Sequence, residues 1–188
     1  SIGTVFMTLY NIVDTYFAGK ISALALAALA QTFPVYFIII ALGVGLSIGT
    51  TSLIANAIGE KKEKNASYFL AQSIILSILV AVVVTTLGIN LGPYIIAAMN
   101  KNIITLNLSM EYLNIIFLGC IFVFIQMSVN SSLSAIGDTR SNMNVLIFTF
   151  FLNILLNPLF IFGYGIIPAM GIKGIALSTV VCQFFGTL

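Results

Sequence analysis

The sequence predicts an all-α, polytopic membrane protein with six transmembrane helices, and two observations lead to this fold class. Of the 188 residues, 60% are hydrophobic and 6% are charged, whereas roughly 25% of the residues in an ordinary soluble domain are charged. Four stretches without a charge, at 21–59, 65–100, 112–137 and 141–172, each exceed the roughly 20 residues that one membrane-spanning helix needs. A soluble fold could not cover its surface with so few charged side chains.

The composition argues against several classes of function. The formal net charge is +2, and the basic residues are scattered at predicted helix ends, so a nucleic-acid partner is not indicated. The chain contains no histidine, which removes the commonest proton shuttle and metal ligand. Its two cysteines, Cys120 and Cys182, fall inside predicted spans, where a thiol behaves as a small apolar side chain.

The first helix is predicted over about 2–18, and Asp14 is its one acidic residue. An ionised carboxylate inside a bilayer costs roughly 2.5–3.5 kcal/mol on insertion scales, so Asp14 is interpreted as a functional site that has a partner. Tyr10 and Asn11 precede it by four and three residues, and this helical spacing allows the three side chains to meet. The alternative is a polar face that packs on a neighbouring helix through hydrogen bonds.

The second helix is expected to begin within 23–31, after a turn at Gly19 and Lys20, and to continue to about 58. Its uncharged length exceeds one bilayer crossing, so we expect tilt, an interfacial first turn, or a kink near Pro34, since proline cannot donate a helical hydrogen bond. The charged segment 59–65 follows as a short solvated loop. It contains no arrangement of side chains that suggests an active site.

A third helix is predicted over about 66–89, with its end near Gly88 and the Gly92–Pro93 pair, because glycine and proline mark helix ends. Its aliphatic middle, 74–84, is expected to face lipid. Residues 95–110 are more polar and are predicted to form an interfacial helix or a loop.

The fourth helix is predicted over about 112–136 and the fifth over about 142–163, with the polar turn 137–140 between them. The fifth helix contains Asn153 and Asn157, one turn apart and immediately before Pro158. A proline frees a backbone carbonyl one turn earlier, and this carbonyl beside two amides makes a place where a cation could bind. The alternative is that the two asparagines only join helices through hydrogen bonds.

The sixth helix is predicted to begin near Gly171 and to continue to the last residue. The first predicted helix has only about 17 residues and the chain ends within an apolar run, so both ends are expected to be cut. We therefore expect the sequence to be part of a longer protein.

The distribution of basic residues favours a cytoplasmic amino terminus, because lysine and arginine are enriched in cytoplasmic loops. The connections between helices two and three and between helices four and five contain four of them, Lys61, Lys62, Lys64 and Arg140. The other connections contain three, Lys20, Lys101 and Lys173. In this orientation Asp14 lies in the outer half of the membrane.

Six segments, taken in chain order, resemble successive motifs of MATE transporters, the multidrug and toxic compound extrusion family. The segments cover nearly the whole chain, and their order makes the resemblance specific. They are 10–19 (YNIVDTYFAG), 43–50 (GVGLSIGT), 57–60 (AIGE), 135–140 (AIGDTR), 153–163 (NILLNPLFIFG) and 171–179 (GIKGIALST).

The resemblance implies a transporter of twelve helices in two six-helix lobes, of which residues 1–188 would be the amino-terminal lobe and the second lobe would be absent. It also implies antiport in the plasma membrane, in which a cationic drug or another toxic organic compound leaves in exchange for protons or sodium. The implied cation site consists of Asp14, Asn153, Asn157 and Thr179, with Tyr10 and Asn11 as a supporting network. No cofactor is implied, and no metal other than sodium at this same site.

One residue departs from the family pattern. Many relatives have aspartate before the proline of helix five, where this sequence has Asn157, so the site would contain one formal negative charge instead of two. A single carboxylate with amides and a hydroxyl suits a proton or a weakly bound sodium ion.

Three other functions are weighed against antiport. A flippase for a lipid-linked oligosaccharide should have basic residues inside its cavity to bind pyrophosphate, and none of the seven basic residues lies clearly inside a span. An intramembrane enzyme would need a nucleophile with a base, or metal ligands. A non-transporting assembly subunit would keep all its activity after replacement of Asp14.

Overall fold

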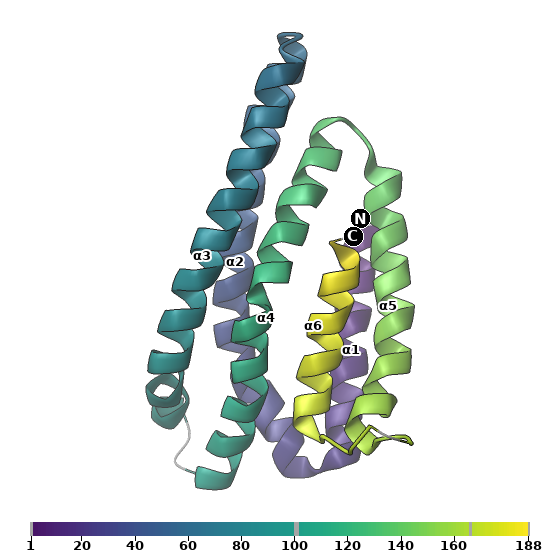
Figure 1. The fold of residues 1–188 in the computed structure, drawn as a ribbon. Coiled ribbons are helices and arrows are strands. Elements are labelled where there is room, and N and C mark those ends of the chain that lie inside the picture. The colour runs from purple at the N-terminus through teal and green to yellow at the C-terminus, as the bar shows by residue number, and fades with distance from the viewer. Residues whose placement is uncertain (1, 100–101, 166, 188) are drawn as a thin grey trace.

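The computed structural model describes residues 2–99, 102–165 and 167–187, without the side chains of residues 2–8. Its six helices are α1 (Ile2–Ile21), α2 (Ala23–Gly59), α3 (Glu63–Met99), α4 (Ile103–Ala135), α5 (Thr139–Phe162) and α6 (Ile172–Gly186) (Figure 1). In the described part of the chain, α2, α3, α4 and α5 are long and apolar enough to cross a membrane, and α6 is a shorter apolar helix. The predicted all-α membrane fold is therefore confirmed.

The boundary between α1 and α2 lies slightly beyond the predicted one. Gly19 and Lys20 belong to α1, which continues to Ile21. Ser22 is the N-cap of α2, and its hydroxyl accepts a hydrogen bond from the backbone N–H of Ala25 at 3.0 Å. This side chain satisfies one of the N–H groups that lack a partner at the start of a helix, which is why the new helix begins here.

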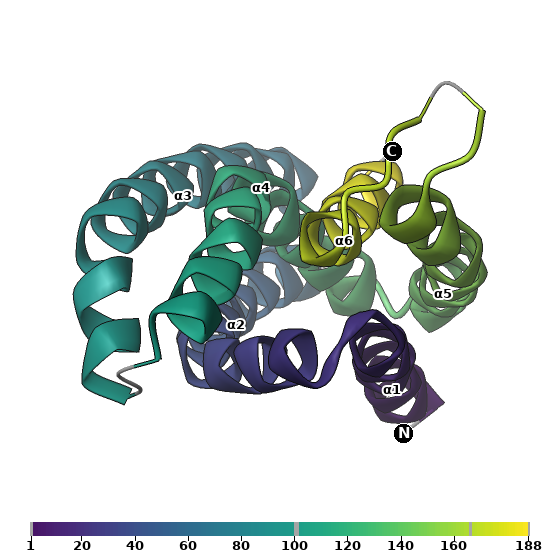
Figure 2. The same cartoon turned by 90° about the horizontal axis from the view of Figure 1, so that it is seen from below.

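The first part of α2 runs at an angle to the rest of the helix (Figure 2). Pro34 lies inside α2, and a proline in a helix interior removes one backbone hydrogen bond and bends the helix. The bend agrees with the kink near Pro34 that was one of the three expectations for this long helix.

The prediction that the third helix ends near Gly88 is wrong, since α3 continues through Gly88, Gly92 and Pro93 to Met99. The two glycines do not end the helix. They allow α4 to pack closely against α3. A Cβ atom at Gly88 would collide with the ring of Phe117 in α4, and a Cβ at Gly92 would lie 3.1 Å from Met110. The last turns of α3 bend away from the axis of the helix (Figure 2), and Pro93 lies inside this helix, where a proline is the usual cause of a bend.

The prediction of a separate interfacial segment at 95–110 is also wrong. Its ends belong to α3 and α4, and α4 begins immediately after Asn102. The Oδ1 atom of Asn102 accepts hydrogen bonds from the backbone N–H groups of Ile104 at 3.0 Å and Thr105 at 3.4 Å. Asparagine is a strong N-cap, so the polar residue starts a helix here. Lys101 lies outside the described residues.

Helix α4 is the central element of the bundle, and it packs against α2, α3 and α6 (Figure 1). Helix α5 lies on the other side of α6 and packs against α1 (Figure 2). Hydroxyl groups join α3 to α4: Ser77 and Ser128 lie 2.7 Å apart, and Thr85 donates to the carbonyl of Phe117 at 2.6 Å. Such contacts between small polar residues are typical of helices packed inside a bilayer.

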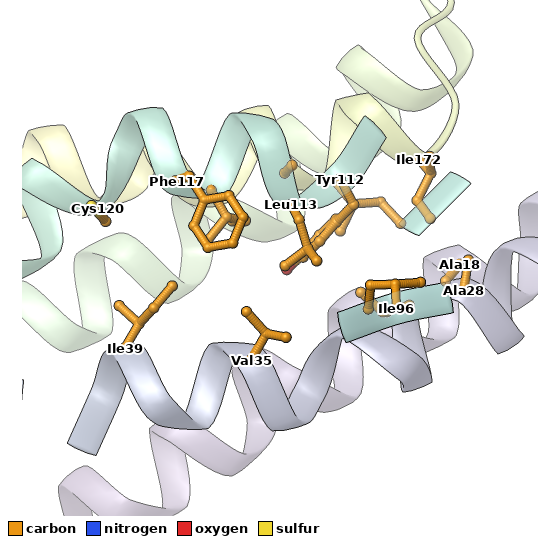
Figure 3. Close-up of a cluster of buried hydrophobic side chains, with 14 of the residues drawn as sticks. Ala18, Ala28, Val35, Ile39, Ile96, Tyr112, Leu113, Phe117, Cys120 and Ile172 are labelled. Carbon is orange, nitrogen blue, oxygen red and sulfur yellow. The ribbon is translucent and has the colours of Figure 1, made fainter. Parts of the chain in front are cut away.

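A cluster of buried apolar side chains surrounds the first half and the middle of α4 (Figure 3). The cluster contains Leu113 and Phe117 of α4 and Val35 and Ile39 of α2. In contrast, the aliphatic residues in the middle of α3 are largely exposed, among them Leu79, Val82 and Val83. This exposure agrees with the prediction that the middle of this helix faces lipid.

Candidate functional site

The carboxylate of Asp14 lies where α1 meets α5 and α6, and only 6% of this residue is exposed. Asn157 of α5 donates from Nδ2 to Asp14 Oδ1 at 2.8 Å. Thr179 of α6 donates from Oγ1 to Asp14 Oδ2 at 3.2 Å. Each carboxylate oxygen therefore accepts a hydrogen bond from a different helix.

The carboxamide of Asn157 is the centre of this network. Its Nδ2 also donates to Asn153 Oδ1 at 3.0 Å, so both of its N–H groups have acceptors. Its Oδ1 accepts from the hydroxyl of Ser178 at 2.6 Å. Asn153 and Asn157 are completely buried, because their spacing of four residues places both on the face of α5 that packs against α1 and α6.

The structure thus brings Asp14, Asn153, Asn157 and Thr179 together, and it adds one residue that the sequence analysis missed. Ser178 is completely buried beside Thr179 and joins α6 to the amide of Asn157. Serine is common in transmembrane helices as a packing residue, so its identity alone did not distinguish it. Its position next to Thr179 was the available signal.

No basic side chain compensates the charge of Asp14 within the described residues. The two ion pairs found there are Lys62–Glu60 and Lys173–Glu111, and all four side chains are exposed. The same residues contain no group of three or more histidine, cysteine, aspartate or glutamate side chains that could hold a metal ion. A proton or a small cation would therefore supply the formal positive charge that an ionised Asp14 lacks here.

The orientation of the amides bears on which cation fits. Carboxylate, amide and hydroxyl oxygens are suitable ligands for a hard cation such as sodium. However, the N–H group of Asn157 points at Asp14 and its Oδ1 accepts from Ser178, so the amide oxygen of Asn157 could join Asp14 in binding a metal ion only if this amide turned. A proton on the carboxylate needs no such rotation. The Nδ2 atom of Asn153 is buried without a hydrogen-bond partner, so the amide network is not saturated.

A small chamber of about 10 Å³ adjoins the carboxylate. This is roughly the volume that one water molecule needs. Its lining includes the predicted supporting residues Tyr10 and Asn11, and also Thr32, Tyr36 and Tyr112, which the sequence analysis did not select. These last three come from α2 and α4, and no spacing within α1 could have indicated them.

A much larger cavity of about 650 Å³ lies next to this chamber. Its size falls in the range of roughly 300–1,000 Å³ that is usual for small-molecule sites. Tyr10, Asn11, Phe33 and Tyr36 line both the chamber and the cavity. The same side chains thus separate the buried carboxylate from a space that can hold an organic molecule.

A polytopic helical bundle with a buried carboxylate beside a ligand-sized cavity is an arrangement typical of membrane transport proteins. The family model named MatE matches residues 1–159, and the chain belongs to this family. The resemblance to MATE transporters that the motifs indicated is confirmed, and the protein is a multi-pass membrane protein.

Two relatives and one solved structure illustrate the similarity. The chain is 31% identical over 188 residues to a probable multidrug resistance protein, NorM, of Thermotoga maritima, covering 97% of this chain and 39% of that protein. It is 29% identical over 170 residues to an FAD transporter of Shewanella oneidensis, covering 90% and 38%. An outward-facing multidrug resistance MATE transporter of the MOP superfamily aligns with a TM-score of 0.90 at 30% identity, covering 99% and 40%. The chain therefore spans about 40% of the length of the proteins that it matches.

Proposed function

We propose that the full-length protein is a secondary active antiporter that exports cationic drugs or other toxic organic compounds in exchange for protons or sodium. The observation that supports this most directly is the buried carboxylate of Asp14, which is hydrogen-bonded by Asn157 and Thr179 and lies beside a cavity of about 650 Å³. Relatives named as a multidrug resistance protein and an FAD transporter support export of organic molecules. The activity is transport and not enzymatic catalysis.

Asp14 is the coupling residue in this proposal, and Asn153, Asn157 and Thr179 orient it or bind the ion. An ion can drive a conformational change only if its affinity differs between the outward- and inward-facing states, and about 1.4 kcal/mol of difference shifts the populations tenfold. Asp14 accepts one hydrogen bond from α5 and one from α6. Movement of α1 relative to these helices would change both hydrogen bonds and therefore the affinity of the carboxylate for a cation. The substrate binds in the large cavity, and Tyr10 and Asn11 connect it to the ion site.

In this proposal residues 1–188 form the amino-terminal six-helix lobe, and a second six-helix lobe of the same chain completes the substrate path. The protein resides in the plasma membrane, the inner membrane where a cell has two, with its amino terminus in the cytoplasm. A lipid flippase is less well supported, because the described lining of the large cavity contains no lysine or arginine that could bind pyrophosphate.

The test is export by the purified full-length protein in liposomes that contain ethidium or, in a parallel set, riboflavin, with a pH gradient and a sodium gradient imposed in separate experiments. We expect one of the two gradients to drive export above the rate seen without a gradient. The 188-residue chain alone should insert but not transport, since it contains one of the two lobes. Gradient-independent flux in the full-length protein, or gradient-driven export by residues 1–188 alone, would contradict the proposal.

Thr179→Val should lower the rate of gradient-driven export by about tenfold, because a hydrogen bond to a charged group contributes roughly 1.5–3 kcal/mol. The valine has nearly the same shape but cannot donate to Asp14 Oδ2, as Thr179 does at 3.2 Å. The measurement is the initial export rate against the concentration of the coupling ion. Thr179→Ser retains the hydroxyl and is the control; equal curves for valine and threonine would exclude a role for this hydrogen bond.

A further inference from the structure

Besides Asn11, four carboxamide side chains line the large cavity. Gln126 and Asn130 lie one turn apart on α4, Asn142 comes from α5, and Gln183 comes from α6. Within the described residues none of the four makes a side-chain hydrogen bond, although Gln126 is only 7% exposed. A carboxamide has two N–H donors and an oxygen acceptor. The polar atoms of Gln126 have no protein partner in the described part of the chain and are not among the fully buried side-chain atoms, so they are open to hydrogen bonds with a molecule in the cavity.

The amide of Gln126 packs against α6. It touches the backbone of Gly186, where an added Cβ atom would collide with Nε2. A glutamine that is held in place presents its donor and acceptor in a defined orientation, so less side-chain entropy is lost when a ligand binds.

A second part of the cavity lining is aromatic. Phe33, Tyr36 and Phe37 of α2 line it, and the ring centroids of Phe33 and Phe37 lie 6.4 Å apart at an interplanar angle of 36°. Aromatic rings of this kind offer faces on which a planar ring system can stack. The cavity therefore combines stacking surfaces with carboxamides that can bond to the edge of a ring.

The lining contains no charged side chain among the described residues. Asp14 lies in the adjoining small chamber, and both of its oxygens already accept hydrogen bonds from the protein. Among these lining residues a permanent cation would find aromatic faces, which contribute roughly 0.5–2 kcal/mol, and neutral amide and hydroxyl oxygens, but no carboxylate. A site with unpaired amides also discriminates strongly against compounds that cannot bond to them.

We infer that this cavity selects uncharged, planar heteroaromatic compounds whose edges alternate hydrogen-bond donors and acceptors, in preference to permanent organic cations. Gln126 and Asn130 determine this specificity by pairing with the ring edge, as carboxamides pair with the edge of a nucleobase. The inference rests on the proposed function and narrows its substrate class. Flavin-like, pterin-like and purine-like ring systems have this chemistry, whereas ethidium does not.

The experiment compares the binding of riboflavin and ethidium, two planar fluorescent molecules that differ in charge, to the full-length protein in detergent. Binding is followed by fluorescence and needs no ion gradient. We expect a lower Kd for riboflavin. Gln126→Met keeps the volume but removes the donor and acceptor, and it should raise the Kd for riboflavin about tenfold without changing that for ethidium. Gln126→Glu and Asn130→Asp should instead lower the Kd for ethidium relative to riboflavin.

The control is Asn144→Met, which replaces an exposed carboxamide of α5 that does not line the large cavity; both Kd values should remain unchanged. Tighter binding of ethidium by the wild type, or riboflavin binding that neither Gln126→Met nor Asn130→Asp alters, would overturn the inference. Selective riboflavin binding in a protein that exports neither riboflavin nor ethidium under either gradient would overturn the antiport proposal alone, so the two failures can be told apart.

Discussion

Asp14→Asn in the full-length protein is expected to reduce gradient-driven export at least about 100-fold, which corresponds to the loss of roughly 2.7 kcal/mol of differential ion binding. Asparagine has the same shape as aspartate but no charge in any conformational state. It therefore cannot bind a proton or sodium ion more tightly in one state than in the other. The readout is substrate efflux from liposomes under the gradient that drives the wild type.

The substitution should leave the fold intact. Asparagine Oδ1 can still accept from Asn157, as Asp14 Oδ1 does now, and its amide can donate to the hydroxyl of Thr179. The measured loss therefore reports on coupling and not on misfolding, which the unfolding temperature of the variant will verify.

Asp138→Asn is the matched control, since it makes the same chemical change outside the membrane-spanning segments. Asp138 is the N-cap of α5, and the hydrogen bonds from Ser141 hold the pKa of this carboxyl below its usual range. It is therefore ionised at neutral pH, and the substitution removes a full charge there as well. Asparagine is an equally good N-cap, so export should continue. Export by Asp14→Asn at the rate of Asp138→Asn would assign Asp14 a structural role only, as an assembly subunit predicts.

Gly174→Ala is expected to lower the stability of the protein by about 1–3 kcal/mol, or more if the backbone cannot move. A Cβ atom at Gly174 would lie 2.6 Å from the carbonyl carbon of Phe160 and 2.7 Å from the backbone nitrogen of Ile161. These are backbone atoms of α5, which cannot rotate away as a side chain can. The methyl group must therefore push α6 away from α5.

The consequence reaches the ion site, because Gly174 lies one turn before Ser178 on α6. A shift of α6 lengthens the hydrogen bonds from Ser178 to Asn157 and from Thr179 to Asp14. The measurement is thermal unfolding of the full-length protein together with its export rate. Gly45→Ala is the control, since no heavy atom lies within 4 Å of a Cβ placed there; equal unfolding temperatures for the two variants would show that the α5–α6 contact tolerates a methyl group.

The sequence was informative about the site where local spacing or charge was sufficient. A carboxylate in an apolar run marked Asp14, and two asparagines one turn apart marked the buried face of α5. Pro158 lies inside α5, which continues to Phe162; the carbonyl freed by this proline remains a prediction. These features depend on only a few neighbouring residues, so a periodic pattern reveals them.

The sequence was misleading or silent where a neighbouring helix decides the outcome. Glycine often marks the end of a helix, and this made Gly88 and Gly92 misleading. In the structure these glycines allow α3 and α4 to approach each other closely. Ser178, Tyr36 and Tyr112 are ordinary residues of apolar helices until the fold places them beside Asn157 or the chamber at Asp14.

By itself, the sequence determined that the chain is a helical membrane protein, that it has six helices, and that one buried acid is the residue to examine. Composition and period are properties of the chain before it folds, and hydrophobic length alone decides which segments can enter a bilayer. Only the tertiary structure decided which donors reach Asp14 and which side chains share a cavity. Hydrogen bonds and close packing depend on distances of a few ångströms between segments that are more than 100 residues apart, such as Asp14 and Asn157.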